Sequence, residues 1–302
     1  MSRIHEALKR AEQERAAQGA GGSESSIFAP IRDSMPPRPA TVPGMAALSE
    51  AANLDTLLAR CHQAKWTPDA KTMLFFSQKE EHGAEEFRTL RSRLYQMREK
   101  RPLKKILVTS SLPKEGKSFV AANLAQALVR QQGRRALLID ADLRAPRLHL
   151  ALGAPSIPGV SEYLLGENDE FSVIQCGAME HLFFIPSGRV VPNAAELVSN
   201  GRLKYLLEKV EPWFDWIVVD SPPSVPVSDA SLLASACDGV LLVVRSSKTP
   251  FDAAIKMREQ FNQDQLLGVV LNGIGAENGG YPRYYGSYSN YGRKNGRLAE
   301  QR

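Results

Sequence analysis

The sequence predicts an α/β fold, a three-layer, doubly wound and mostly parallel sheet with flanking segments that stay outside it. Two observations predict this. Short runs of Val, Ile and Leu alternate with helical patterns between residues 81 and 272, as expected for a parallel sheet covered on both faces. The chain of 302 residues is 43% hydrophobic and 24% charged, which provides enough apolar material for one large core.

Strands are expected where short apolar runs are bounded by charged or turn-forming residues. They cover residues 105–110, 135–140, 182–185, 216–220, 239–244 and 268–271. Helices are expected before and between them, where apolar residues recur at spacings of three and four. They cover residues 81–100, 117–132, 194–210, 228–236 and 251–260.

The ends of the chain differ in composition from this central region. The first residues have the apolar spacing of a small amphipathic helix, whereas the following stretch is rich in Gly, Ser and Pro and only weakly helical near residues 48–64. We therefore expect four regions: an N-terminal helix (1–18), a mostly disordered linker (19–70), a folded domain (71–278) and a flexible tyrosine-rich tail (279–302).

Composition excludes several classes of protein. No apolar run reaches the roughly 18 residues of a spanning helix, and the N-terminus lacks the apolar stretch of a secretion signal, so we expect a cytoplasmic protein without a transmembrane segment. The three cysteines are dispersed, which argues against disulfides and zinc. The tail holds five Lys or Arg and one Glu, so it carries +4 of the net charge of +5, and no nucleic-acid partner is expected for the folded domain.

A phosphate-binding pattern follows the first expected strand. Residues 111–118 read Ser-Leu-Pro-Lys-Glu-Gly-Lys-Ser and lead directly into a helix. Backbone N–H groups of such a turn bind phosphate oxygens, Lys117 can reach the outer phosphates, and the Ser118 hydroxyl can ligate Mg²⁺. The expected nucleotide site consists of Ser111, Lys114, Glu115, Gly116, Lys117, Ser118 and Phe119.

Aspartates stand at the ends of two other strands. Asp140 and Asp142 follow one apolar run, and Asp220 ends another. Ligands bind at this edge of an open α/β sheet, so we expect Asp142 and Asp220 to bind Mg²⁺ together with Ser118. Asp140 and Asp142 are the candidates for deprotonating an acceptor hydroxyl. Capping of a following helix is the alternative role for any one of these carboxylates.

Taken in order, these motifs resemble the cytoplasmic bacterial tyrosine kinases of capsular and exopolysaccharide synthesis, which have a ParA/MinD-like P-loop ATPase fold. The resemblance covers about residues 80–291. Residues 111–118 resemble the family's Walker A motif, 138–144 its second Asp motif and 220–223 its Walker B motif. This resemblance implies a protein-tyrosine kinase that uses ATP and Mg²⁺.

Two further segments carry the resemblance. Glu85, Arg88 and Arg91 resemble the family's Glu-x-x-Arg-x-x-Arg motif, which implies a contact between subunits of a homo-oligomer; by spacing alone a solvated helix face is the alternative. The C-terminal cluster resembles the family's phosphate acceptors and contains Tyr281, Tyr284, Tyr285, Tyr288 and Tyr291. A tail without a role, or one that stacks on single-stranded nucleic acid, is the alternative there.

The phosphate loop departs from the family pattern at one position. Lys114 stands where the family usually has Gly, and it costs about 1 kcal/mol if this position needs a positive φ. Its side chain could add a cation beside the phosphates or remain a solvated surface lysine. Leu112 occupies the place of the signature Lys of ParA/MinD-type partition ATPases, which disfavours a partitioning role.

We interpret the chain as a tyrosine autokinase that phosphorylates its own tail and regulates assembly or export of a surface polysaccharide. The resemblance implies a separate membrane partner, a polysaccharide co-polymerase or chain-length regulator, and therefore a location at the inner face of the cell membrane. One alternative is a P-loop ATPase that switches a membrane partner without phosphorylating tyrosine. Another is a non-enzymatic scaffold whose tail binds RNA or protein, for which Lys117 would not matter.

Overall fold

The structure is a computed structural model that describes residues 56–75, 83–177 and 179–274. Its strands are β1 (His62–Gln63), β2 (Lys105–Ser110), β3 (Ala136–Asp140), β4 (Gln175–Cys176), β5 (Leu182–Ile185), β6 (Trp216–Asp220), β7 (Gly239–Arg245) and β8 (Leu266–Asn272). They form one eight-stranded sheet in the order β1-β4-β5-β3-β6-β2-β7-β8. Only the pair β4 and β5 is antiparallel, so the predicted mostly parallel sheet is confirmed.

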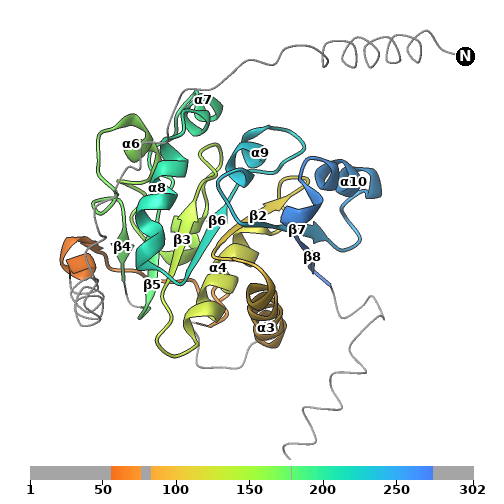
Figure 1. The fold of residues 1–302 in the computed structure, drawn as a ribbon, viewed down its shortest axis with the longest axis horizontal. Helices are drawn as coiled ribbons and strands as arrows, with labels where there is room; N and C mark the ends of the chain where they lie inside the picture. The colour runs from red at the N-terminus through yellow and green to blue at the C-terminus, as the bar shows by residue number, and fades with distance from the viewer. Residues whose placement is uncertain (1–55, 76–82, 178, 275–302) are drawn as a thin grey trace, which may run out of the picture. The chain divides into compact units, whose positions relative to one another are not determined.

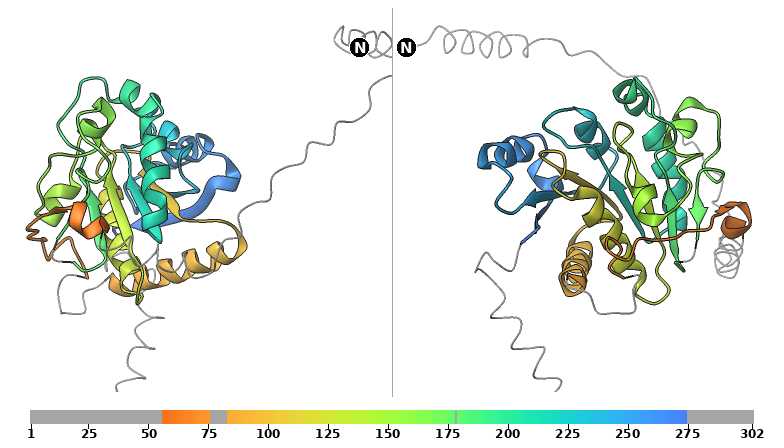
Figure 2. Two further views of the ribbon diagram at one scale, coloured as in Figure 1. Left: turned by 60° about the vertical axis from the view of Figure 1, so that its left-hand side comes forward. Right: turned by 180° about the vertical axis from the view of Figure 1, so that it is seen from behind.

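Helices cover both faces of this sheet (Figures 1 and 2). They are α3 (Ala84–Lys100), α4 (Lys117–Val129), α5 (Leu148–Leu152), α6 (Val160–Leu165), α7 (Ala194–Ser199), α8 (Arg202–Val210), α9 (Asp229–Ala234) and α10 (Phe251–Glu259), with short 3₁₀ turns η1 (Glu211–Trp213) and η2 (Gln263–Gln265). Buried residues of α3, α4 and α5 pack on one face, whereas those of α6 to α10 pack on the other. The predicted three layers are confirmed.

The alternation of side chains along the central strands explains why both faces need cover. On β2, Ile106 and Val108 belong to the core beneath α4, whereas Leu107 between them belongs to the core on the opposite face. All three are fully buried. A parallel strand that is apolar on both faces reads as a continuous hydrophobic run, which is the pattern that made these strands recognisable.

One predicted helix was wrong. The stretch 194–210 is two helices, because α7 ends at Ser199 and α8 begins only after Gly201. Gly201 has a φ of 82°, a left-handed conformation that cannot continue a right-handed helix. The sequence Asn200-Gly201 is a typical turn signal within this apolar pattern.

Part of the stretch expected as linker is packed into the folded domain. Leu57 and Trp66 are buried, and residues 56–60 are helical. The Asn123 side chain of α4 accepts a hydrogen bond from the Leu74 N–H and donates one to the Thr72 carbonyl, both at 2.8 Å. The folded domain therefore begins before residue 71, the boundary expected from composition.

Several elements are too short for a periodic pattern and were not predicted. They are the strands β1 and β4 and the helices α5 and α6. The expected N-terminal helix and the tyrosine cluster lie outside the described residues. Across the described ranges, no helix combines the length and the apolar character needed to cross a bilayer.

Candidate active site

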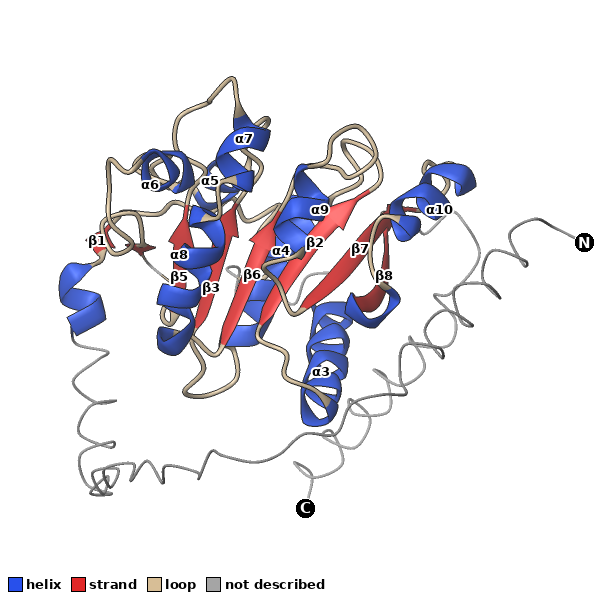
Figure 3. Ribbon diagram, turned by 45° about the horizontal axis from the view of Figure 1, so that its top comes forward, coloured by secondary structure: helices blue, strands red, loops and turns tan. Residues whose placement is uncertain are grey.

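The loop between β2 and α4 has the backbone of a phosphate-binding turn. Gly116 immediately precedes α4 with a φ of 98°, and α4 begins at Lys117. The free N–H groups and the dipole of a helix N-terminus favour a bound anion. A Cβ at Gly116 would lie 2.0 Å from the Asn272 Nδ2 atom, so only glycine fits here. Figure 3 shows the loops after β2, β3 and β6 at the same end of the sheet.

Lys117 lies between two carboxylates. Its Nζ atom is 2.7 Å from Asp142 Oδ2 and 3.9 Å from Asp220 Oδ2. Burial pulls the pKa of Lys117 down, but the negative charges of Asp220 and Asp142 outweigh it, so the pKa is raised and the side chain stays cationic. The structure therefore brings together three of the residues predicted to carry the chemistry.

Asp220 is a buried carboxylate whose oxygens lack well-formed hydrogen bonds. It is fully buried at the end of β6, and neither of its oxygens has a hydrogen bond of good geometry among the described residues, although the Ser118 hydroxyl and the Ser221 N–H lie close enough to lower its pKa. Burial raises its pKa, and the nearby Lys117 opposes this rise. A buried carboxylate in this state is costly unless it binds something, since a charge removed from water needs a partner. Asp220 therefore fits a metal ion or a metal-bound water.

Asp140 lies directly opposite Asp220 in the register of β3 and β6. Its Oδ1 accepts a hydrogen bond from the Asp142 N–H, and its Oδ2 accepts bonds from the Arg147 and Leu148 N–H groups at the start of α5. Burial, and then the charge of Asp220, raises its pKa. These contacts match the helix-capping alternative, and they make Asp140 a residue that shapes the loop carrying Asp142.

The side chains of three predicted nucleotide-site residues contact other groups of the phosphate loop or helix α3. The Glu115 carboxylate is buried and accepts hydrogen bonds from Ser111 Oγ and from the Leu112 N–H. Phe119 packs edge-on against Phe87 of α3, with ring centroids 6.0 Å apart. Of these residues, only backbone groups are left to face a nucleotide. Ser118 Oγ, in contrast, lies 3.3 Å from Lys117 Nζ, within the site.

Lys114 has a φ of 67°, in the region that favours glycine. The steric cost considered for this position, about 1 kcal/mol, therefore applies. The Arg245 guanidinium at the end of β7 donates a hydrogen bond of 2.9 Å to the Lys114 carbonyl. This contact stabilises the strained peptide from outside the loop.

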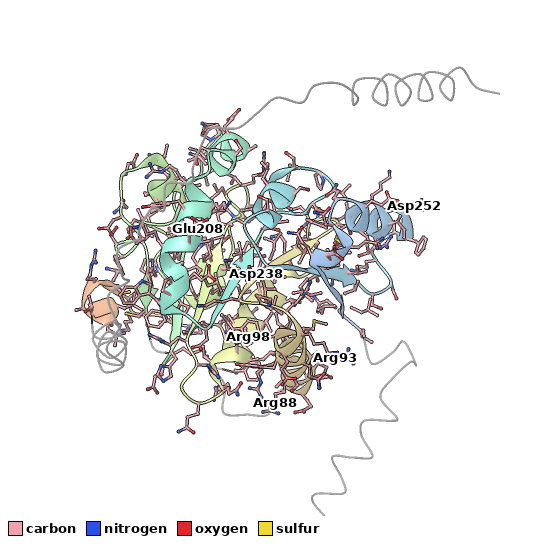
Figure 4. All side chains as sticks on the ribbon, viewed as in Figure 1. Arg88, Arg93, Arg98, Glu208, Asp238 and Asp252 are labelled. Carbon is pink, nitrogen blue, oxygen red and sulfur yellow. The ribbon has the colours of Figure 1, made fainter. Side chains whose placement is uncertain are left out.

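The residues predicted for a subunit contact have local partners in the chain. Arg88 forms an exposed ion pair with Glu85 at 2.8 Å, as in a solvated helix face. Arg91 Nη1 donates a 2.9 Å hydrogen bond to the Ala127 carbonyl in the last turn of α4. Arg91 thus ties α3 to α4, whereas Arg88 stays at the surface of α3 (Figure 4).

Several residues that complete the site were not predicted. The Arg144 guanidinium binds the buried Asp229 carboxylate through two hydrogen bonds, of 2.7 and 3.1 Å, and joins the loop of Asp142 to the start of α9. Asn272 donates a 2.9 Å hydrogen bond to the Glu115 carbonyl. The position of Asn272 at the carboxyl end of the last strand was the signal that could have indicated it.

The arrangement fits a nucleotide bound with Mg²⁺. Among the residues that the structure describes, no group of three or more His, Cys, Asp or Glu could hold a metal by itself. Mg²⁺ at phosphate-transfer sites takes one or two carboxylates and completes its shell with phosphate oxygens and water. Asp220, whose buried oxygens lack well-formed hydrogen bonds, and the Ser118 hydroxyl are suited to this arrangement.

Comparison with known proteins identifies the family. Residues 104–263, more than half of the chain, match the AAA domain family. The tyrosine-protein kinase YwqD of Bacillus subtilis (strain 168) is 36% identical over 214 residues, which cover 70% of this chain and 90% of that protein. The chain belongs to the bacterial tyrosine kinases. This kinase also resembles the kinase domain of the Escherichia coli tyrosine kinase ETK, with 30% identity and a TM-score of 0.60 over 67% of this chain and 79% of that domain.

The wider fold is shared beyond the kinases. The septum site-determining protein MinD of Pyrococcus horikoshii, solved with Mg-ADP, superposes with a TM-score of 0.51 at 22% identity, covering 61% of this kinase and 75% of that chain. This similarity concerns the fold alone. It confirms the ParA/MinD-like P-loop architecture expected from the motifs.

Proposed function

We propose that this kinase uses ATP and Mg²⁺ to phosphorylate tyrosines in its own C-terminal cluster. The observation that carries the proposal is the placement of Lys117 between Asp142 and the buried Asp220, at the N-terminus of α4, which Gly116 immediately precedes. The named relatives support tyrosine as the acceptor. Tyr281 follows Asn272, the last residue of β8, after only a short stretch of the same chain.

Each residue of the site has a separate role in phosphoryl transfer. Lys117 is cationic, and its side chain can reach the transferred phosphoryl group from the phosphate loop. There it stabilises negative charge. This role takes Lys117 away from Asp142, whose carboxylate then accepts a proton or a hydrogen bond from the tyrosine hydroxyl. Ser118 and Asp220, with a contribution from Asp142, would hold Mg²⁺, which when bound would neutralise negative charge on the phosphates. Asp140 keeps the Asp142 loop in place through its backbone hydrogen bonds.

The proposal extends to the cellular role, which rests on the family resemblance. The kinase regulates capsule or exopolysaccharide synthesis and export as a homo-oligomer. It works at the inner face of the cell membrane with a membrane polysaccharide co-polymerase or chain-length regulator.

The decisive experiment is mass spectrometry of the purified full chain after incubation with ATP and Mg²⁺. Wild-type protein should gain phosphate on tyrosines between residues 281 and 291. Lys117→Met should lose at least about 99% of this label, because a neutral thioether cannot replace a cation worth several kcal/mol at the transferred group. Lys256→Met, at an exposed position on α10, is the matched control and should label normally.

Two outcomes would contradict the proposal. Wild-type-like labelling of a folded Lys117→Met chain would remove the assigned role of the phosphate loop. Release of free phosphate by the wild type without any phosphotyrosine would favour the nucleotide-switch alternative instead.

A further inference from the structure

Two side chains from the last strands hold consecutive carbonyl groups of the phosphate loop. Arg245 Nη1 at the end of β7 donates to the Lys114 carbonyl, and Asn272 Nδ2 at the end of β8 donates to the Glu115 carbonyl, each at 2.9 Å. The two strand ends are themselves joined, because the Ser246 N–H donates to the Asn272 carbonyl at 2.8 Å. The joined ends of β7 and β8 therefore hold the phosphate loop in place from outside it.

Because the peptide bond is planar, the two hydrogen bonds to these carbonyls also orient the N–H groups of the residues that follow. In a trans peptide the C=O and the following N–H point in opposite directions. Fixing the Lys114 carbonyl thus fixes the Glu115 N–H, and fixing the Glu115 carbonyl fixes the Gly116 N–H. Because both carbonyls turn toward the strand ends, both N–H groups turn away from them, and we infer that they face the bound phosphate oxygens.

Independent contacts show that this arrangement is tight. The Gly116 position leaves no space for a Cβ next to Asn272. Thr249, in the turn after β7, accepts a hydrogen bond from the Arg245 N–H at 2.9 Å, and its hydroxyl donates to the Glu115 carboxylate. Backbone and side chain of Glu115 are therefore both held by residues of the last two strands and their turn.

We propose that Arg245 and Asn272 are positioning residues that preorganise the Glu115 and Gly116 N–H groups for the phosphates of the nucleotide. Neither needs to touch the reacting atoms. The proposal rests on the nucleotide chemistry of the proposed function, but not on the identity of the phosphate acceptor. Arg245 also accounts for the tolerance of Lys114, since its hydrogen bond stabilises the peptide that follows the left-handed residue.

The first test is Asn272→Asp, which keeps the shape of the side chain but replaces its donor with an acceptor facing the Glu115 carbonyl. We expect affinity for a fluorescent ADP analogue, measured on the full chain with Mg²⁺, to fall by about tenfold or more. The KM for ATP should rise more than kcat falls, because these N–H groups bind the phosphates before and during transfer. Lys248→Ala, exposed in the same turn as Thr249, is the control and should bind normally.

The second test uses the Arg245 contact, which is more exposed, so that its loss should leave the fold intact. Arg245→Met removes the donors and should weaken ADP analogue binding severalfold, whereas Arg245→Lys keeps one donor and should restore most of it. Unchanged affinity in folded Asn272→Asp and Arg245→Met chains would overturn the proposal. Equal loss in Arg245→Met and Arg245→Lys would also overturn it. Since the readout is nucleotide binding, a failure to find phosphotyrosine in the tail would leave this test intact.

Discussion

At the scale of single residues, Asp220 places a carboxylate in the core with few groups to compensate its charge. Its carboxylate is fully buried, and its closest cation, Lys117 at 3.9 Å, is hydrogen-bonded to Asp142 instead. A buried carboxylate without hydrogen bonds costs free energy that a ligand can recover. The residue is therefore explained by what it binds and not by what it stabilises in the protein alone.

This cost predicts the effect of Asp220→Asn on the nucleotide-free kinase in the presence of a chelator. Burial raises the pKa of Asp220 above the ordinary value of 3.8, so the folded state holds this proton more tightly than the unfolded state. The stability that depends on the proton is complete below about pH 4 and is lost as pH rises through the raised pKa. Asp220→Asn avoids this loss and should be more stable than wild type at pH 8 by about 1 kcal/mol, although inactive.

Urea unfolding at pH 5 and pH 8 measures this difference. The gap between Asp220→Asn and wild type should be wider at pH 8. Asp252→Asn, at an exposed position in the first turn of α10 (Figure 4), is the matched control and should run parallel to wild type. An Asp220→Asn variant as stable as wild type at both pH values would show that the buried Asp220 carboxylate does not cost the fold stability.

The single residues also show what a sequence can and cannot predict of a site. Lys117, Asp142 and Asp220 follow apolar strands, and parallel strands bring these ends to one edge, so their meeting could be predicted. Arg245 and Asn272 reach the loop from 131 and 157 residues away, through the pairing of strands that no local pattern specifies. Contacts of side chains with backbone carbonyls leave no motif. The position of Asn272 at a strand end could have indicated that it lies near the site, but not which group it contacts.

At the scale of elements, helix α3 contains two arginines with different roles. Arg91 donates to the Ala127 carbonyl, one of the last carbonyls of α4 and therefore without a following N–H in that helix. Arg88 pairs with Glu85 at the surface, where both side chains are largely exposed. Their shared motif therefore combines a contact within the chain and a group available to a neighbouring subunit.

This difference predicts separable effects of two substitutions. Arg91→Ala should destabilise the fold by about 1 kcal/mol, because it leaves a partly buried carbonyl without its donor. Arg88→Ala should change stability by no more than about 0.5 kcal/mol, as expected for an exposed ion pair, and yet shift the proposed homo-oligomer toward monomer. Urea unfolding and light scattering measure the two effects.

Arg93→Ala tests a different position on the same helix, since Arg93 is exposed and lies five residues along α3 from Arg88 (Figure 4). It should change neither stability nor mass. An unchanged assembly in Arg88→Ala would return Arg88 to the alternative of a solvated helix face.

Elements also mark the limits of prediction by periodicity. The central strands were predicted nearly to the residue, because burial on both faces makes them continuous apolar runs. The break between α7 and α8 was missed, since the apolar spacing continues across it and only Gly201 interrupts the helix. The packing of residues 56–75 was missed for a different reason: a few anchors such as Leu57 and Met73 suffice to hold an irregular segment.

At the scale of the whole molecule, charge is divided between the folded region and the tail. The tail from residue 279 onward carries a net +4, whereas the phosphate site contains Asp140, Asp142 and Asp220 around Lys117. If the tail is the acceptor, as proposed, its positive charge attracts it to an acidic site, and each phosphotyrosine adds about −1.5 to −2 at pH 7. Several phosphates would therefore reverse the charge of the tail and turn attraction into repulsion.

This balance, together with the proposed homo-oligomer, predicts that transfer occurs between subunits. A Lys117→Met chain with its tail intact, mixed with an active chain truncated after residue 278, should gain phosphate on its own tyrosines, because an acidic site on one subunit attracts the basic tail of another. Either chain alone should remain unlabelled in this region. Mass spectrometry of the mixture measures the label, and adding Arg88→Ala to both chains should reduce it by weakening their association. If the Lys117→Met chain stays unlabelled while an active chain with its tail intact labels its own tyrosines, transfer occurs within one subunit instead.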